Sequence, residues 1–114
     1  MGYMPEFNWV LKIKPEQGLD ENNLETEKIY NFSKQGSRNY PLLYPILLVN
    51  NIWEAIGLVE ILNFNADKDS TKGKYKVIKI YKDIDKEILT KFLQDNIRYY
   101  KKEYTKDFKD IKAT

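Results

Sequence analysis

The stretch that decides the fold runs from Trp53 to Phe64 and reads WEAIGLVEILNF. Its apolar and β-branched content predicts a strand, yet it is long compared with the ~5–6 residues of an average strand. Gly57 in its middle predicts a β-bulge or a sharp bend, the device with which small barrels turn a corner. We therefore expect a sheet that curves strongly around this strand.

Other stretches of strand character lie on both sides of it. Residues 7–13 alternate apolar and polar side chains, and residues 28–33 and 74–81 show the same period of two. Residues 44–49 form a continuous apolar run, as in a strand covered on both faces. Asn50-Asn51 then predicts a tight hairpin, because asparagine tolerates a positive φ. Five strands with short turns indicate a small bent antiparallel sheet or a partly closed five-stranded barrel.

After Asp83 the period changes to that of a helix. Asp85 is placed to cap its start, and Ile84 and Leu89 are spaced for a hydrophobic staple. The apolar residues then recur at helical spacing and predict one buried face made of Leu89, Phe92, Leu93, Ile97, Tyr100 and Tyr104. The prediction is one α+β domain over residues 1–114, with a β-rich part at 1–81 and a C-terminal amphipathic helical part at 83–112.

Composition narrows the chemistry. The chain has 114 residues, enough for one core, and contains neither His nor Cys. Zinc fingers, disulfide frameworks, thiol nucleophiles and triads with a His base are thereby excluded. We expect no cofactor and no bound metal. The absence of an export signal and of a long apolar segment predicts a cytoplasmic protein with no membrane contact.

The net charge of +2 conceals an uneven distribution. Residues 72–114 contain 13 Lys+Arg against 7 Asp+Glu, whereas residues 1–71 contain 6 against 10. Cations on one side of the predicted helix form a basic stripe of Lys91, Arg98, Lys102, Lys106 and Lys109. A basic C-terminal surface is suited to phosphate or to an acidic protein partner, although the same lysines are also what a solvated face carries.

Residues 72–81 alternate lysines with aromatic or apolar side chains, as strands that stack nucleic-acid bases do. Tyr75, Val77, Lys79 and Tyr81 are expected on one face, which favours single-stranded RNA as the ligand. The alternative is an edge strand whose lysines prevent aggregation. The candidate binding residues are Arg38, Tyr75, Lys79, Tyr81, Lys91, Arg98 and Lys102.

Carboxylates supply the alternative chemistry. Asp67-Lys68-Asp69-Ser70-Thr71 matches the pattern of aspartyl-phosphate phosphatases, but its polar flanks argue against that assignment, because the nucleophile belongs at the end of a buried parallel strand. Glu54 and Glu60 share a strand face if no bulge intervenes, and two acids in a barrel mouth could perform acid/base work.

Several short motifs are similar to those of a family of short uncharacterised domains from Gram-positive bacteria. They lie within residues 1–81 and comprise the opening residues 1–8, the segment from Tyr30 to Leu42, Pro45-Ile46 and Glu54-Ala55-Ile56-Gly57. The resemblance implies a small β-rich cytosolic domain and supplies no functional residues.

The residues favour a non-enzymatic binding module, which uses its basic C-terminal surface to bind single-stranded RNA or another anionic partner. Two alternatives stay open. One is a small enzyme with paired carboxylates in a barrel mouth, and the other is a homodimer formed through an exposed strand.

Overall fold

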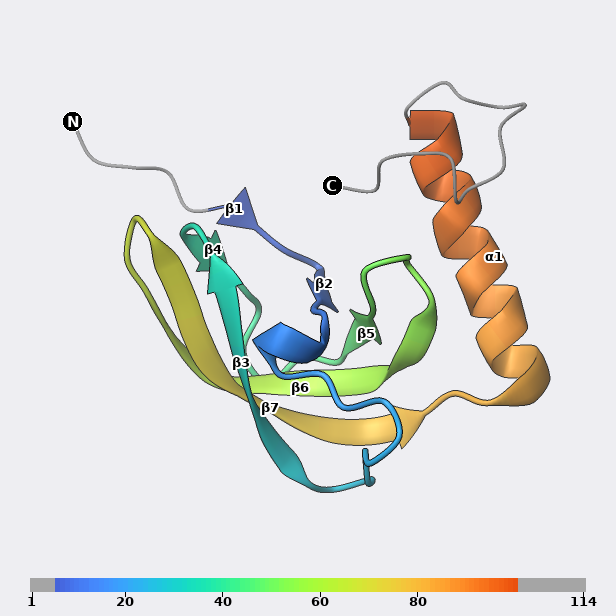
Figure 1. Ribbon diagram of the computed structural model, residues 1–114, viewed down its shortest axis with the longest axis horizontal. Helices are drawn as coiled ribbons and strands as arrows, with labels where there is room; N and C mark the ends of the chain where they lie inside the picture. The colour runs from blue at the N-terminus through green and yellow to red at the C-terminus, as the bar shows by residue number, and fades with distance from the viewer. Residues whose placement is uncertain (1–5, 101–114) are drawn as a thin grey trace.

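The computed structural model describes residues 6–100, with side chains from Asn8 onward. The chain forms β1 (Glu6–Phe7), β2 (Val10–Lys12), the 3-10 helix η1 (Pro15–Gln17), β3 (Ile29–Gln35), β4 (Arg38–Asn39), β5 (Ile46–Val49), β6 (Ala55–Ala66), β7 (Ser70–Ile80) and α1 (Asp83–Tyr100). Figure 1 shows a curled sheet with α1 beside it. The predicted α+β class, a bent sheet packed by one C-terminal helix, is confirmed.

The main sheet has five strands in the order β2-β5-β6-β7-β3, so β2 and β3 are its edges. Three neighbouring pairs are antiparallel, but β2 pairs with β5 in parallel, Val10 opposite Leu47. The sheet is therefore a mixed half-barrel and not purely antiparallel. β7 lies between β6 and β3, so its interpretation as an edge strand is wrong. Self-association through β2 or β3 stays a prediction.

Bulges curl the two long strands. Leu48 pairs with Gly57 and Val49 with Ala55, which makes Ile56 an extra residue directly beside the predicted bend at Gly57. Gly57 is required there, because a Cβ would lie 2.5 Å from the Lys79 carbonyl oxygen. Glu54 and Glu60 were expected on one face only if no bulge intervened. This bulge lies between them, so they do not share a face of the strand.

A second bulge changes the face of β7. Leu58 pairs with Lys79 and Val59 with Val77, which leaves Ile78 as an extra residue. Tyr75 and Val77, before the bulge, face the interior and are fully buried, whereas Lys79, after it, is exposed. Tyr75 and Val77 share one face as expected, but the expectation is wrong for Lys79, because the extra residue Ile78 reverses the alternation.

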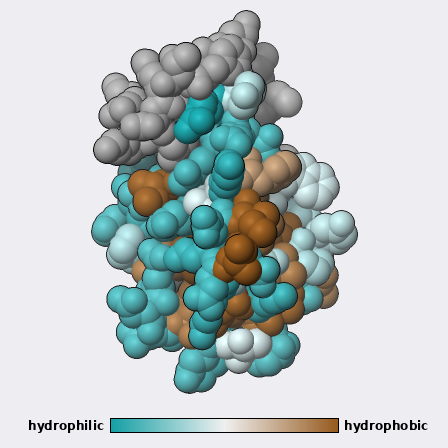
Figure 2. Space-filling view, turned by 90° about the vertical axis from the view of Figure 1, so that its right-hand side faces the viewer, coloured by the Kyte–Doolittle hydropathy of each residue, from teal (hydrophilic) through white to brown (hydrophobic). Residues whose placement is uncertain are grey.

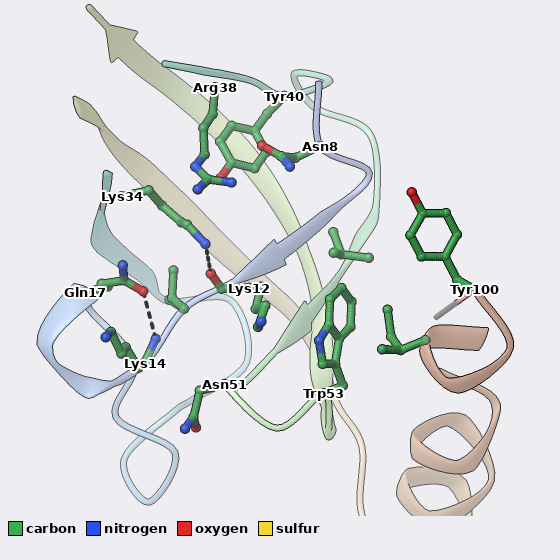
Figure 3. Close-up of a pocket in the computed structure, with 13 residues that line it drawn as sticks. Asn8, Lys12, Lys14, Gln17, Lys34, Arg38, Tyr40, Asn51, Trp53 and Tyr100 are labelled. Carbon is green, nitrogen blue, oxygen red and sulfur yellow. Dashed lines mark hydrogen bonds between the residues drawn. The ribbon is translucent and has the colours of Figure 1, made fainter. Parts of the chain in front are cut away.

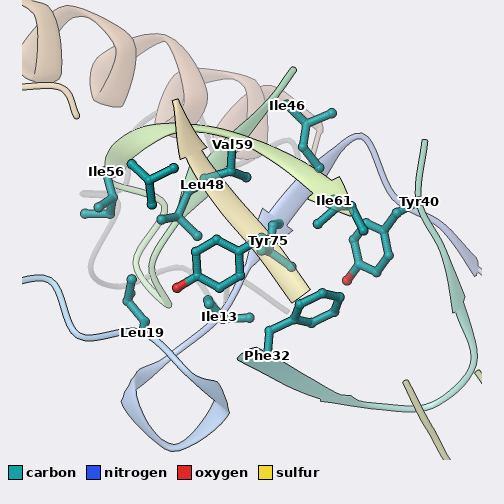
Figure 4. Close-up of a cluster of buried hydrophobic side chains, with 12 residues drawn as sticks. Ile13, Leu19, Phe32, Tyr40, Ile46, Leu48, Ile56, Val59, Ile61 and Tyr75 are labelled. Atoms are coloured by element: carbon teal, nitrogen blue, oxygen red, sulfur yellow. The ribbon is translucent and has the colours of Figure 1, made fainter. Parts of the chain in front are cut away.

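Two apolar clusters hold the fold together. The larger fills the inside of the curl around Tyr75 (Figure 4) and comprises Leu11, Ile13, Leu19, Phe32, Tyr40, Ile46, Leu48, Ile56, Val59, Ile61, Tyr75 and Val77. The smaller joins α1 to the other side of the sheet through Val49, Ala55 and Leu93. Thr90 supports this contact, since its Oγ1 accepts a 3.0 Å hydrogen bond from the Ala55 N–H.

The helix departs from its predicted cap and its predicted face. It begins at Asp83, whose φ is +54°, and not after a cap at Asp85. Ile84 is 65% exposed, so the staple with Leu89 is absent, and Phe92 on the supposed buried face is 64% exposed. Figure 2 looks at this side, where hydrophobic residues interrupt a hydrophilic surface.

The predicted residues 101–112 lie outside the described chain. Over residues 6–100 no helix has both the length and the apolarity for a membrane crossing.

Candidate anion-binding pocket

The predicted binding residues do not come together. Tyr75 is fully buried, and its hydroxyl donates a 2.9 Å hydrogen bond to the Gly18 carbonyl, so its expected role in stacking on a base is wrong. Burial also raises the pKa of Tyr75. Lys79 lies over the ring of half-buried Tyr81, 5.5 Å from the centroid, beside the start of α1.

The expected basic stripe is weak over the described helix. Lys91 is exposed, and Arg98 Nη1 lies 3.6 Å from Asp95 Oδ1. Both line a groove that also contains Glu54, Asp83, Glu87 and Asp95. Residues 83–100 carry three basic against four acidic side chains. Lys102 lies outside the described residues. Of the predicted residues that the structure describes, Arg38 alone lines the pocket described next.

A cavity of about 580 Å³ opens between β2, the ends of β3 and β4, the turn before β6 and the last turn of α1 (Figure 3). We call it the cationic pocket. Its described lining is Asn8, Val10, Lys12, Ile13, Lys14, Gln17, Lys34, Arg38, Tyr40, Asn51, Trp53, Ile97 and Tyr100. Four of these side chains are basic, and none of those that the structure describes is acidic.

Backbone pairing places two of the basic residues. Lys12 follows Leu11 in β2; Leu11 points into the core, so Lys12 points to the opposite side. Its Nζ lies 4.9 Å from the centroid of the Trp53 ring, a cation–π distance. Lys34 extends from β3 and donates a hydrogen bond to the Lys12 carbonyl oxygen. The edge strands β2 and β3 are thereby connected across the pocket.

Arg38 is held by the turn after β3. A turn at Gln35-Gly36-Ser37 follows the strand, with Gly36 at φ +79°. Buried Thr71 fixes it, because its Oγ1 donates to the Gly36 carbonyl at 2.9 Å and accepts from the Arg38 N–H at 2.9 Å. The Arg38 Nε–H donates to the Gln35 carbonyl at 3.0 Å. Arg38 thus starts from a rigid backbone.

Lys14 stands at the start of η1, where its backbone N–H donates to Gln17 Oε1 at 3.2 Å. The Lys14 side chain is about half exposed, and its Nζ lies 4.0 Å from Glu16 Oε2; Glu16 does not line the pocket. An ion pair of this length at an exposed position contributes little stability. The contact with Glu16 therefore does not hold the Lys14 side chain away from the pocket that it lines.

The turn before β6 sets the position of Trp53. The predicted hairpin at Asn50-Asn51 is confirmed, but the positive φ of +62° falls on Trp53. Buried Asn50 organises the turn: its Oδ1 accepts from the N–H groups of Ile52 at 3.1 Å and Glu54 at 2.9 Å. Its Nδ2 donates to Glu54 Oε1 at 2.8 Å, which shows that Glu54 has a structural partner.

The carboxylate that begins the phosphatase-like pattern belongs to a turn. Asp67 lies at the tip of the β6–β7 hairpin, where its Oδ1 accepts from the N–H groups of Asp69 and Ser70, both at 2.8 Å. These bonds lower the pKa of Asp67. The phosphatase-like pattern is thus a turn motif at the end of antiparallel strands.

Sequence reasoning missed Lys12, Lys14, Lys34 and Trp53. The net charge of the N-terminal part of the chain concealed these cations. Residues 1–71 are acidic in total, yet four of their six basic residues line this one cavity.

Comparisons with known proteins support the fold. No family model matches the chain, and no curated protein matches it. Among solved structures, the chain is similar to protein ytmB from Bacillus subtilis, with 22% identity and a TM-score of 0.57 over 71% of this chain and 95% of that chain. Likeness at this identity shows a common fold and carries no statement about function.

Proposed function

We propose that this protein is a non-enzymatic binding protein that holds a small oxygen-rich anion in the cationic pocket. The observation that carries the proposal is the convergence of Lys12, Lys14, Lys34 and Arg38 on one cavity whose described lining has no acidic side chain. Cations that gather around one cavity create a positive potential there, and this potential attracts an anion.

The dimensions favour a small molecule over a nucleic-acid strand. A volume of about 580 Å³ falls within the range of ~300–1,000 Å³ for ligand pockets. The predicted surface is less suited to RNA than expected, because Tyr75 is buried and the described helix carries more acids than bases. The site of the proposed binding module therefore moves from the C-terminal surface to the cationic pocket.

Binding is favoured over catalysis by the groups present. The described lining contains no carboxylate, and the chain contains no His or Cys, so the commonest general bases and a thiol nucleophile are missing. What remains is a set of positively charged hydrogen-bond donors, which suit oxygen-rich anions.

Calorimetric titration with inorganic pyrophosphate at low salt tests the proposal. We expect saturable binding that weakens as NaCl is raised, because salt screens the ionic contacts. Arg38→Gln and Lys14→Gln should each weaken binding by about three- to tenfold, equivalent to ~1 kcal/mol. Lys74→Gln is the matched control, because Lys74 is an exposed residue of β7 outside the cationic pocket.

Equal losses in Lys74→Gln and Arg38→Gln would contradict the pocket. A labelled single-stranded RNA that binds more tightly than pyrophosphate, with no change in Arg38→Gln, would also contradict it and would favour the surface instead.

A further inference from the structure

The cationic pocket has two unlike sides. In Figure 3, Lys14, Lys34 and Arg38 lie on the side of η1, β3 and β4, whereas Trp53 and Tyr100 lie toward α1. Val10 and Ile97 add aliphatic surface to the lining. A bare inorganic ion would use only the charged side and would leave the apolar side in contact with water.

Trp53 is held in an unfavourable conformation on the apolar side. A φ of +62° is costly for a residue with a Cβ, and here the Asn50 hydrogen bonds maintain it. Strain of this kind collects at functional sites, where it fixes a side chain in the orientation that a ligand needs. In Figure 3 the indole nitrogen of Trp53 is directed toward Lys12 and the charged side.

The indole N–H is also an unused donor. Trp53 Nε1 is buried and has no hydrogen-bond partner among the described residues. A buried donor without an acceptor is costly and rare in native proteins, and an indole nitrogen serves only as a donor. An acceptor oxygen in the pocket would satisfy it. This observation is independent of the charge of the lysines.

From these features we propose that the ligand is an aromatic anion: a flat ring that carries a phosphate or carboxylate group. The anionic group lies among Lys12, Lys34 and Arg38, and one of its oxygens accepts the Trp53 Nε1–H. The ring lies against Val10 and Ile97 at the helix end. This inference rests on the proposed function and adds the ligand's apolar part and a neutral donor.

Matched probe pairs test it on the full chain. Phenyl phosphate is compared with inorganic phosphate, and benzoate with acetate, so that each pair differs by the ring and the two pairs separate the phosphate from the carboxylate source. We expect the ring to tighten binding by about tenfold in at least one pair, because it removes apolar surface from water. The pair with the larger gain identifies the anionic group.

The donor is followed by nitrogen-15 NMR of the indole groups. The chain has two tryptophans, Trp9 and Trp53, and Trp9 does not line the pocket. Trp9→Phe therefore assigns the Trp53 signal. On addition of phenyl phosphate or benzoate, the Trp53 Nε1–H proton should move downfield while that of Trp9 stays in place. Trp53→Phe should weaken binding of the better aromatic probe severalfold, and Trp9→Phe should not.

The outcomes separate the two proposals. If the ring-free ions bind as tightly as the aromatic ones, the aromatic ligand is wrong and the proposed function stands. If neither pyrophosphate nor any of these four probes saturates, both are wrong. If pyrophosphate alone saturates, the aromatic ligand is wrong and the proposed function stands. If an aromatic probe saturates but the Trp53 proton does not move, the indole is not a ligand donor. The last test uses the unmutated chain, so it holds even if Trp53→Phe does not fold.

Discussion

The Tyr75 hydroxyl donates a 2.9 Å hydrogen bond to the backbone carbonyl of Gly18, connecting the centre of β7 to the residue that ends η1. The Tyr75 ring stacks on Tyr30 with 5.6 Å between centroids and meets Phe32 at 6.2 Å. This tyrosine, expected on the ligand surface, is therefore the central side chain of the core.

Tyr75→Phe keeps the ring and removes the hydroxyl. We expect the free energy of unfolding to fall by ~1–2 kcal/mol, because the Gly18 carbonyl loses a buried partner. Urea denaturation measures the change. Tyr44→Phe, at a residue 58% exposed, is the control and should change stability by less than ~0.5 kcal/mol. Pyrophosphate affinity should be unchanged in both, and a loss in Tyr75→Phe alone would return Tyr75 to the site.

The same hydroxyl gives stability a dependence on alkaline pH. Burial raises the pKa of Tyr75 above its ordinary value of 10.0, so the folded state keeps its proton where the unfolded state loses it. The stabilisation is complete below the unfolded pKa and is lost as pH rises above about 10. Denaturation between about pH 8 and 11 should show a smaller loss in Tyr75→Phe than in Tyr44→Phe. Parallel losses in the two variants would contradict this account.

Two glycines with positive φ separate steric overlap from backbone strain. Gly18 has φ +114°, and a Cβ there would lie 2.1 Å from the Asn31 carbonyl oxygen. Gly36 has φ +79° but no atom within 4 Å of a Cβ. Gly36→Ala should cost ~1–2 kcal/mol for strain alone, and Gly18→Ala at least ~3 kcal/mol, in thermal or urea unfolding. Equal costs would show that the loop after η1 moves aside.

Adjacent helix residues test which face of α1 is buried. Leu93 is 9% exposed and packs with Val49 and Ala55, whereas Phe92 is 64% exposed. Leu93→Ala should lower the free energy of unfolding by ~2–4 kcal/mol and Phe92→Ala by less than ~1 kcal/mol, although Phe92 loses the larger side chain. The reverse order in denaturation experiments would restore the face predicted from the sequence.

The turn that holds Trp53 depends on Asn50. This residue is 4% exposed and makes three side-chain hydrogen bonds within the turn. Asn50→Ala should cost ~2–3 kcal/mol, because it leaves buried groups without partners. It should also weaken binding of an anion in the cationic pocket, since Trp53 loses its support. Asn51→Ala, at the exposed neighbour, is the control for stability and should cost less than ~1 kcal/mol.

Local signals predicted the local features of this fold. Gly57 marked the bulge beside it, Asn50-Asn51 marked the hairpin, and the change of period after Asp83 marked the helix. Each depends on a few neighbouring residues whose backbone preferences survive in the folded chain.

The site could not be predicted in this way, because its wall is built by long-range pairing. Lys12 and Trp53 meet only because β2 joins β5 in parallel, and no periodicity encodes that partner. The alternation of side chains along β7 placed Tyr75 on the face opposite to its sequence neighbours, but it could not show which face is buried. The bulge at Ile78 then separated Lys79 from Tyr75.

The parallel ladder between β2 and β5 has a kinetic consequence. β5, β6 and β7 follow one another along the chain as hairpins, whereas β2 pairs with a strand that lies much further along the sequence. Contacts between distant segments form late, because closing the intervening loop costs conformational entropy before any stabilising contact has formed. β3 pairs with the equally distant β7 through seven residues, whereas the ladder of β2 spans only three. We therefore expect β2 to dock late in folding and to detach before β3 in the native state. A molecule bound behind it would slow that detachment, and amide hydrogen exchange at Val10 and Lys12 would record its residence.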